Sequence, residues 1–178
     1  CSVYSRETST ERQYKVRWLV FMALVLYSVW LIFDYQYHFI DYVNLAFHEA
    51  GHLIFTPLGK TFHFLGGTIG QLFFPVVIVV YFWRNDKPFE ASIGAVWFAE
   101  SLMYSAYYMS DARDMLIPLA GGGVHDWNYL FGRWGVLHRA ETIGAFFHVS
   151  AAILLIAVLI FMFRLLNMKQ AGSSEPSP

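Results

Sequence analysis

Two histidines and a glutamate stand close together in an otherwise apolar stretch, in the order His48-Glu49-Ala50-Gly51-His52. On a helix, side chains four residues apart project from the same face, one turn apart. Two neutral imidazoles at that spacing can bind one zinc ion, and the neighbouring glutamate can then take a proton from a metal-bound water molecule. The spacing therefore predicts His48 and His52 as metal ligands and Glu49 as a general base.

A catalytic zinc site needs a third protein ligand and one open position. The best candidate is the polar pair His125-Asp126, which follows the glycine triplet Gly121-Gly122-Gly123. A glycine-rich hinge before a short helix is a physical way to bring a side chain into the middle of a helical bundle. We expect Asp126 to be the third ligand. His125 would then donate a hydrogen bond behind it or stabilise the reacting carbonyl oxygen, although the two roles could be exchanged.

The composition indicates a membrane protein. Hydrophobic residues make up 57% of the 178 residues and charged residues only 14%, whereas soluble domains carry about 25% charged residues. The near-zero net charge gives no electrostatic case for nucleic acid. The single cysteine, Cys1, excludes an internal disulfide and a cysteine-based zinc cluster. Cys1 could carry a lipid, as in a bacterial lipoprotein, or could be an ordinary terminal residue, and the charge distribution favours the second interpretation.

The hydropathy pattern predicts an all-α polytopic membrane protein with about five transmembrane helices and one short, partly inserted helix. A single domain is expected over residues 18–166, after a basic leader at 1–17 and before a disordered tail at 167–178. The predicted long helices are 18–33, 39–56, 65–83, 89–109 and 140–166, with the short helix within 124–137.

The distribution of lysine and arginine predicts that both termini lie in the cytoplasm. In this assignment Lys60 and Arg113 lie on the inner side with the basic leader, while Arg84, Lys87 and Arg139 lie outside. The same orientation argues against a lipid on the first residue, since lipidation would place the N-terminus on the other side.

Two further features of the predicted spans concern packing and buried charge. Gly66 and Gly70 form a small-x-x-x-small pair, which lets another backbone approach closely. Glu100 is a second ionisable group inside a predicted span, where charge is costly. It could be a carboxylate at a substrate gate or behind the metal ligands. The interpretation that we favour is a protonated or hydrogen-bonded glutamate joined to Tyr104 or Ser101.

These motifs together resemble a known family. The HEAGH motif in an early apolar helix, the glycine-rich helix start GGTIGQLFFP (66–75) and a later aspartate after glycines resemble the site-2 protease superfamily of intramembrane zinc metalloproteases. The likeness is closest to its small bacterial branch without a PDZ domain, and it covers residues 43–137. The family usually carries its third ligand in a Leu-Asp-Gly context, where this chain has Val-His-Asp-Trp-Asn at 124–128.

The resemblance implies a function and a location. It implies that His48, His52 and Asp126 hold Zn²⁺, that Glu49 is the general base, and that the substrate is a single-span membrane protein. The implied location is a bacterial inner membrane. Asn128 could hydrogen-bond the substrate backbone.

Two other functions stay open from the sequence. One is a non-proteolytic accessory subunit of a larger membrane complex that keeps a peptidase-derived fold. The other is a small transporter or channel, which is the weaker alternative because the chain shows no inverted repeat.

Overall fold

The computed structural model describes residues 2–119 and 123–173, with side chains placed for 11–119 and 123–168. Every regular element in these residues is a helix, which confirms the all-α prediction. The long elements are α1 (Ser2–Phe33), α2 (Phe39–Phe55), α3 (Lys60–Arg84), α4 (Pro88–Ser110) and α6 (Ala140–Ser173). A short helix α5 (Asp126–Arg133) and two 3₁₀ turns at Thr56–Leu58 and Leu137–Arg139 complete the fold.

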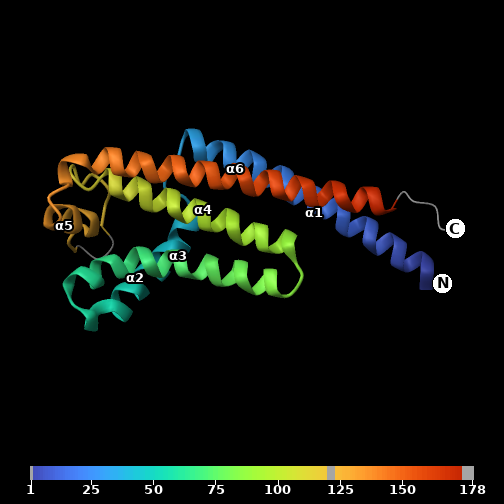
Figure 1. Ribbon diagram of the computed structural model, residues 1–178, viewed down its shortest axis with the longest axis horizontal. Helices are drawn as coiled ribbons and strands as arrows, with labels where there is room; N and C mark the ends of the chain where they lie inside the picture. The colour runs from blue at the N-terminus through green and yellow to red at the C-terminus, as the bar shows by residue number, and fades with distance from the viewer. Residues whose placement is uncertain (1, 120–122, 174–178) are drawn as a thin grey trace.

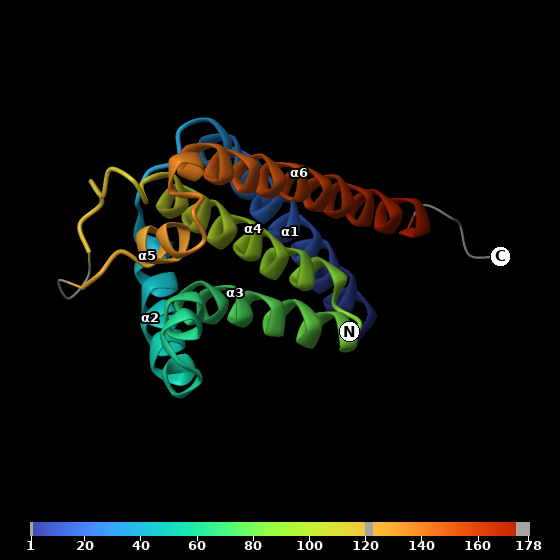
Figure 2. The same cartoon turned by 60° about the vertical axis from the view of Figure 1, so that its left-hand side comes forward.

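Helix α4 forms the centre of the bundle. It packs against α6 on one side and α3 on the other, and α1 packs against α6 (Figure 1). Helix α2 runs steeply across α3 instead of alongside it, and α5 lies at the same end of the bundle as α2 (Figure 2). The start of α1 and the end of α6 lie at one end of the molecule, and α5 lies at the other end (Figure 1).

Three helical segments are long and apolar enough to cross a membrane, namely Glu11–Phe33, Lys60–Arg84 and Leu137–Met168. Their outer faces expose large apolar side chains, such as Leu26 at 70% and Ile153 at 64%. Extended apolar surface of this kind suits contact with lipid. Three of the five predicted spans are therefore supported, namely 18–33, 65–83 and 140–166. Helix α2 has 17 residues, fewer than the roughly 20 that a crossing needs. Helix α4, with 23 residues, is long enough but is not among the three by its composition.

Glycines set the crossing of α2 over α3. A Cβ on Gly51 would overlap the carbonyl oxygen of Gly66, and a Cβ on Gly70 would lie 2.5 Å from the carbonyl oxygen of Phe47. The close approach predicted from Gly66 and Gly70 is thus confirmed, and its partner is the glycine within the HEAGH motif. Gly51 lies between the two histidines in sequence. Its contact with Gly66 therefore brings the side of α2 that carries both histidines against α3.

Several predicted boundaries change. Residues 60–64, expected as a connection, form the first turn of α3. The disorder expected from Asn167 does not begin there, because α6 continues to Ser173. The leader is helical as part of α1, where Lys15 and Glu11 form an ion pair one turn apart. Cys1, Gly121, Gly122 and residues 174–178 lie outside the described residues.

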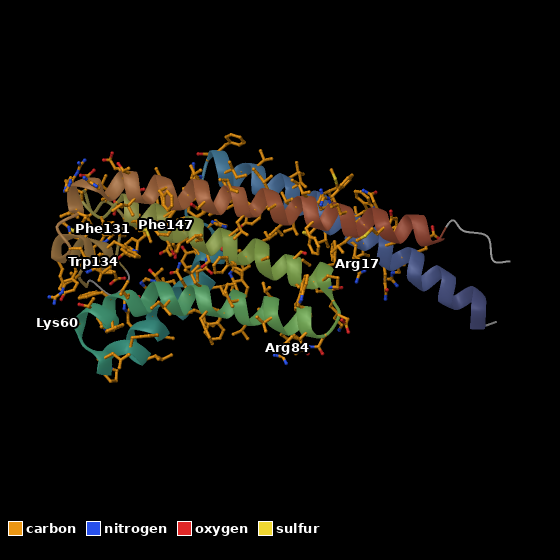
Figure 3. The ribbon with its side chains drawn as sticks, in the orientation of Figure 1. Arg17, Lys60, Arg84, Phe131, Trp134 and Phe147 are labelled. Atoms are coloured by element: carbon orange, nitrogen blue, oxygen red, sulfur yellow. The ribbon has the colours of Figure 1, made fainter. Side chains whose placement is uncertain are left out.

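The structure places two basic residues at other ends of the bundle than the prediction did. Arg84 lies toward the end where Arg17 lies, and Lys60 lies at the opposite end (Figure 3). Arg17 forms an ion pair with Glu90 near the start of α4 at 2.7 Å. Arg84 and Lys87 therefore share the end of the termini, whereas Lys60 and Arg113 share the other end with Arg139.

Candidate metal centre

The three predicted metal ligands meet at one point. Asp126 is the first residue of α5, and its Oδ2 atom lies 2.8 Å from His48 Nε2 and 3.2 Å from His52 Nε2. In a tetrahedral zinc site with bonds of 2.0–2.2 Å, donor atoms lie about 3.3 Å apart. The observed separations differ from that value by no more than about half an ångström, so the three atoms can share one metal ion.

The hydrogen-bond partner of His48 fixes which ring nitrogen carries its proton. Nδ1 lies 2.8 Å from Gln71 Oε1. The Gln71 amide nitrogen is committed elsewhere, because it donates to the carbonyl oxygen of Ser101 at 3.1 Å and to Ser105 Oγ at 2.7 Å. Gln71 therefore offers His48 only an acceptor, so His48 Nδ1 must be the donor. In the neutral ring, the lone pair is then on Nε2, which faces Asp126.

His52 is held in the same way by a backbone group. Its Nδ1 lies 2.7 Å from the carbonyl oxygen of His63, which can only accept. The Nε2 lone pair of the neutral His52 ring therefore also faces Asp126. Three lone-pair atoms pointing at each other are unfavourable unless a proton or a metal ion lies among them. Imidazoles whose outer nitrogen donates to a carbonyl or amide oxygen are typical of metal-bound histidines.

Gly67 allows both imidazoles to lie close to the backbone of α3. A Cβ built on this residue would lie 2.5 Å from His48 Nε2 and 2.7 Å from His52 Nε2. A side chain at this position of α3 would therefore displace both nitrogen donors. Two imidazole nitrogens and one carboxylate oxygen are a common ligand set of catalytic zinc. The residues present therefore fit a zinc ion.

Glu49 lies beside these donors without being enclosed by them. One of its carboxylate oxygens is within 4.8 Å of ring nitrogens of both His48 and His52, and its side chain is exposed. A general base must reach the proton that it removes and must also be reached by water. The position of Glu49 satisfies both conditions.

His125 lies beside Asp126 in sequence but contacts different groups. It caps α5, where its Nδ1 atom accepts from the backbone N–H of Asn128 at 3.2 Å. Its ring stacks on Tyr108 with centroids 4.0 Å apart, and its Nε2 lies 3.5 Å from Asp111 Oδ2. These contacts hold the start of α5 in place. The sequence left open whether Asp126 or His125 is the third ligand. In the structure Asp126 reaches the two histidines of the HEAGH motif, and His125 does not.

Sequence reasoning missed three contributors to this centre. Tyr108 accepts a hydrogen bond from the backbone N–H of Asp126 at 3.3 Å and packs edge-on against His48. Gln71 is a lone amide four residues after Gly67 in an apolar helix, and that isolation was a usable signal. His63 contributes through its backbone carbonyl oxygen. Every residue type has this group, so the sequence could not reveal the contact.

Two predicted polar contacts have other partners in the structure. The Asn128 side chain, expected to meet a substrate backbone, donates to the carbonyl oxygen of Ala112 at 2.8 Å. Glu100, expected to join Tyr104 or Ser101, instead accepts from Asn44 Nδ2 at 2.9 and 3.2 Å.

Comparison of the chain with protein-family models, curated proteins and solved structures finds no match. The resemblance to the site-2 protease superfamily thus stays a prediction from the motif, and the chemistry of the centre follows from its own donor atoms.

Proposed function

We propose that this protein is a zinc-dependent peptidase that hydrolyses peptide bonds of membrane-spanning substrates, as the site-2 protease superfamily does. The observation that carries the proposal is the convergence of two imidazole lone pairs and the Asp126 carboxylate beside Gly67. The Glu49 carboxylate stands next to them. The three apolar helices add the membrane setting.

His48, His52 and Asp126 would hold the zinc ion, which when bound polarises a carbonyl and lowers the pKa of water to about 7. Glu49 accepts the proton of the attacking water and passes it to the leaving amine. Gln71 and the His63 carbonyl keep both imidazoles in the required tautomer.

The surroundings of Glu49 favour an apolar substrate. Leu53 lies one turn after Glu49 on the same exposed face of α2, and Ile54 beside it is also exposed. A membrane-spanning substrate helix has its carbonyl groups already hydrogen-bonded, so it must unwind locally before one of them can react. We infer that the unwound segment lies along this face, with its flanking residues against Leu53.

We infer that both termini are cytoplasmic in a bacterial inner membrane. The end that carries the termini holds the larger share of basic residues, namely Arg6, Arg12, Lys15, Arg17, Arg84, Lys87, Arg164 and Lys169. The opposite end holds Lys60, Arg113, Arg133 and Arg139. Such an excess is typical of the cytoplasmic side.

In a Cys1→Ser background, a cysteine at Asn85 should resist a membrane-impermeant thiol reagent in intact cells, and one at Asp114 should react. The reverse pattern would overturn this orientation.

The function is tested on purified full-length protein with single-span test substrates. Replacing both His48 and His52 by alanine should lower the zinc content by about one ion per chain. Glu49→Gln should keep that ion and abolish cleavage. Glu141→Gln is the matched control, because it removes an exposed carboxylate that pairs with Arg113 and not with a proposed ligand.

Two results would contradict the peptidase proposal. One is a zinc-loaded wild-type protein that cleaves none of the substrates. The other is stoichiometric co-purification with a larger membrane complex that Glu49→Gln leaves unchanged, together with absent hydrolysis. The second result would favour the accessory subunit.

A further inference from the structure

A second group of buried polar side chains lies where α2 begins. His38 precedes the helix, Asp41 lies in its first turn, and Glu100 reaches them from the middle of α4. One possible ligand atom from each of the three lies within 4.8 Å of the others. Asp41 is 0% exposed and Glu100 is 1% exposed. This group shares no residue with the candidate zinc centre.

Hydrogen bonds to the two carboxylates come from neutral donors. Asp41 accepts from the Tyr35 hydroxyl at 2.6 Å and from the backbone N–H of His38 at 2.8 Å. Both Glu100 oxygens accept from the side-chain amide of Asn44. Within residues 11–119 and 123–168, the ion pairs of these carboxylates are with His38 alone. Two neighbouring carboxylates are therefore buried with at most one positive charge to balance them.

Helix capping accounts for only part of this arrangement. The backbone N–H of His38 donates to the Asp41 carboxylate, and this bond belongs to the cap at the start of α2. Glu100 belongs to a different helix and adds a second carboxylate that the cap does not need. Burying an uncompensated charge is strongly unfavourable, so a cation or a proton must accompany it.

The His38 ring is held in position to act as a ligand. It makes edge contacts with Tyr27, Trp30 and Tyr35, with ring centroids 5.0–5.7 Å apart. Its Nδ1 lies 2.8 Å from Asp41 Oδ2 and 3.0 Å from the carbonyl oxygen of Gln36. Its Nε2 lies 3.7 Å from Glu100 Oε1 and meets the Tyr27 hydroxyl. One imidazole and two carboxylates form a donor set that suits Mn²⁺ and Zn²⁺.

We propose that His38, Asp41 and Glu100 bind a second divalent metal ion, which fastens the start of α2 to α4. With a neutral imidazole, a divalent ion balances the two carboxylate charges. Because α2 carries the HEAGH motif one turn beyond Asn44, this ion fixes the position of the helix that bears the first centre. The site does not depend on the proposed peptidase function.

The test uses Mn²⁺ as the probe, in full-length protein whose His48 and His52 are both replaced by alanine. Equilibrium dialysis should find about one Mn²⁺ per chain in this background. Adding Glu100→Gln should abolish that binding. Glutamine resembles a protonated glutamate in size and charge and can still accept from Asn44, so this variant separates a bound metal from a shared proton. Glu90→Gln, on the same helix but paired with Arg17, is the control and should keep the ion.

A second measurement keeps the proposal testable if Glu100→Gln does not fold. In the same background Mn²⁺ should raise the melting temperature, and His38→Gln should remove that rise. Absent Mn²⁺ binding in the background, or binding that both Glu100→Gln and His38→Gln leave unchanged, would overturn the proposal. Since the first centre is already removed, neither outcome bears on the peptidase.

Discussion

Gly67 faces His48 so closely that a methyl group on its Cα would lie 2.5 Å from the ring Nε2 atom. The same methyl group would lie 2.7 Å from His52 Nε2. The backbone of α3 thus lies directly against both ring nitrogens, and it can do so only because residue 67 has no side chain.

Gly67→Ala should therefore weaken zinc binding about 5- to 150-fold, which corresponds to about 1–3 kcal/mol of steric strain. Competition with a chromogenic chelator measures the affinity. Gly132→Ala is the control, because a Cβ on this glycine of α5 would meet nothing within 4 Å. Zinc affinity of Gly67→Ala equal to that of the control would place the ion elsewhere.

Gln71 orients His48 through a single acceptor, so removing that acceptor should weaken the metal site. Gln71→Leu should lower zinc affinity about 10–100-fold, the usual effect of losing a group that orients a metal-bound histidine. Gln71→Glu should recover part of this loss, since a carboxylate oxygen can still accept from His48 Nδ1. Gln36→Leu, at an exposed position, serves as the control. Equal affinities for Gln71→Leu and Gln71→Glu would show that the hydrogen bond does not matter.

The sequence was sufficient to predict which three side chains meet in the candidate centre, because each of them leaves a local pattern. His48 and His52 share a helix face, and Asp126 follows a run of glycines in the sequence. The contact between α2 and α3 was also visible in the spacing of Gly66 and Gly70. These features depend on residue type and short spacing, both of which are read directly from the chain.

Features that depend on how distant segments meet were not visible. Helix α2 is apolar enough to look like a span, but its crossing over α3 follows from the fit of Gly51 against Gly66. The pairing of Asn44 with Glu100 depends on the resulting position of α2 beside α4. For the same reason two basic residues lie at other ends of the bundle than the prediction placed them.

The contact between Gly51 and Gly66 yields a prediction about stability. Two backbones meet there, and neither can move aside in the way that a flexible side chain can. Gly51→Ala should destabilise the protein by about 1–3 kcal/mol or more, as overpacking does. Thermal unfolding in detergent should show a lower midpoint than in Gly132→Ala. The variant should also lose zinc, because α2 must move away from α3. A wild-type midpoint would mean that the helices are not in contact at this residue.

The identity of the third ligand can be decided by comparing Asp126→Asn with His125→Gln. Loss of a direct ligand should reduce zinc affinity by about 100-fold or more, beyond the 10–100-fold effect of losing a supporting residue. Asp126→Asn should show the larger loss, since its oxygen lies against both imidazoles. His125→Gln should show the smaller one, since His125 caps α5 and faces Asp111. Asp114→Asn, which alters an exposed carboxylate paired with Arg113, is the control. A larger loss in His125→Gln would make the imidazole the ligand and reverse the assignment.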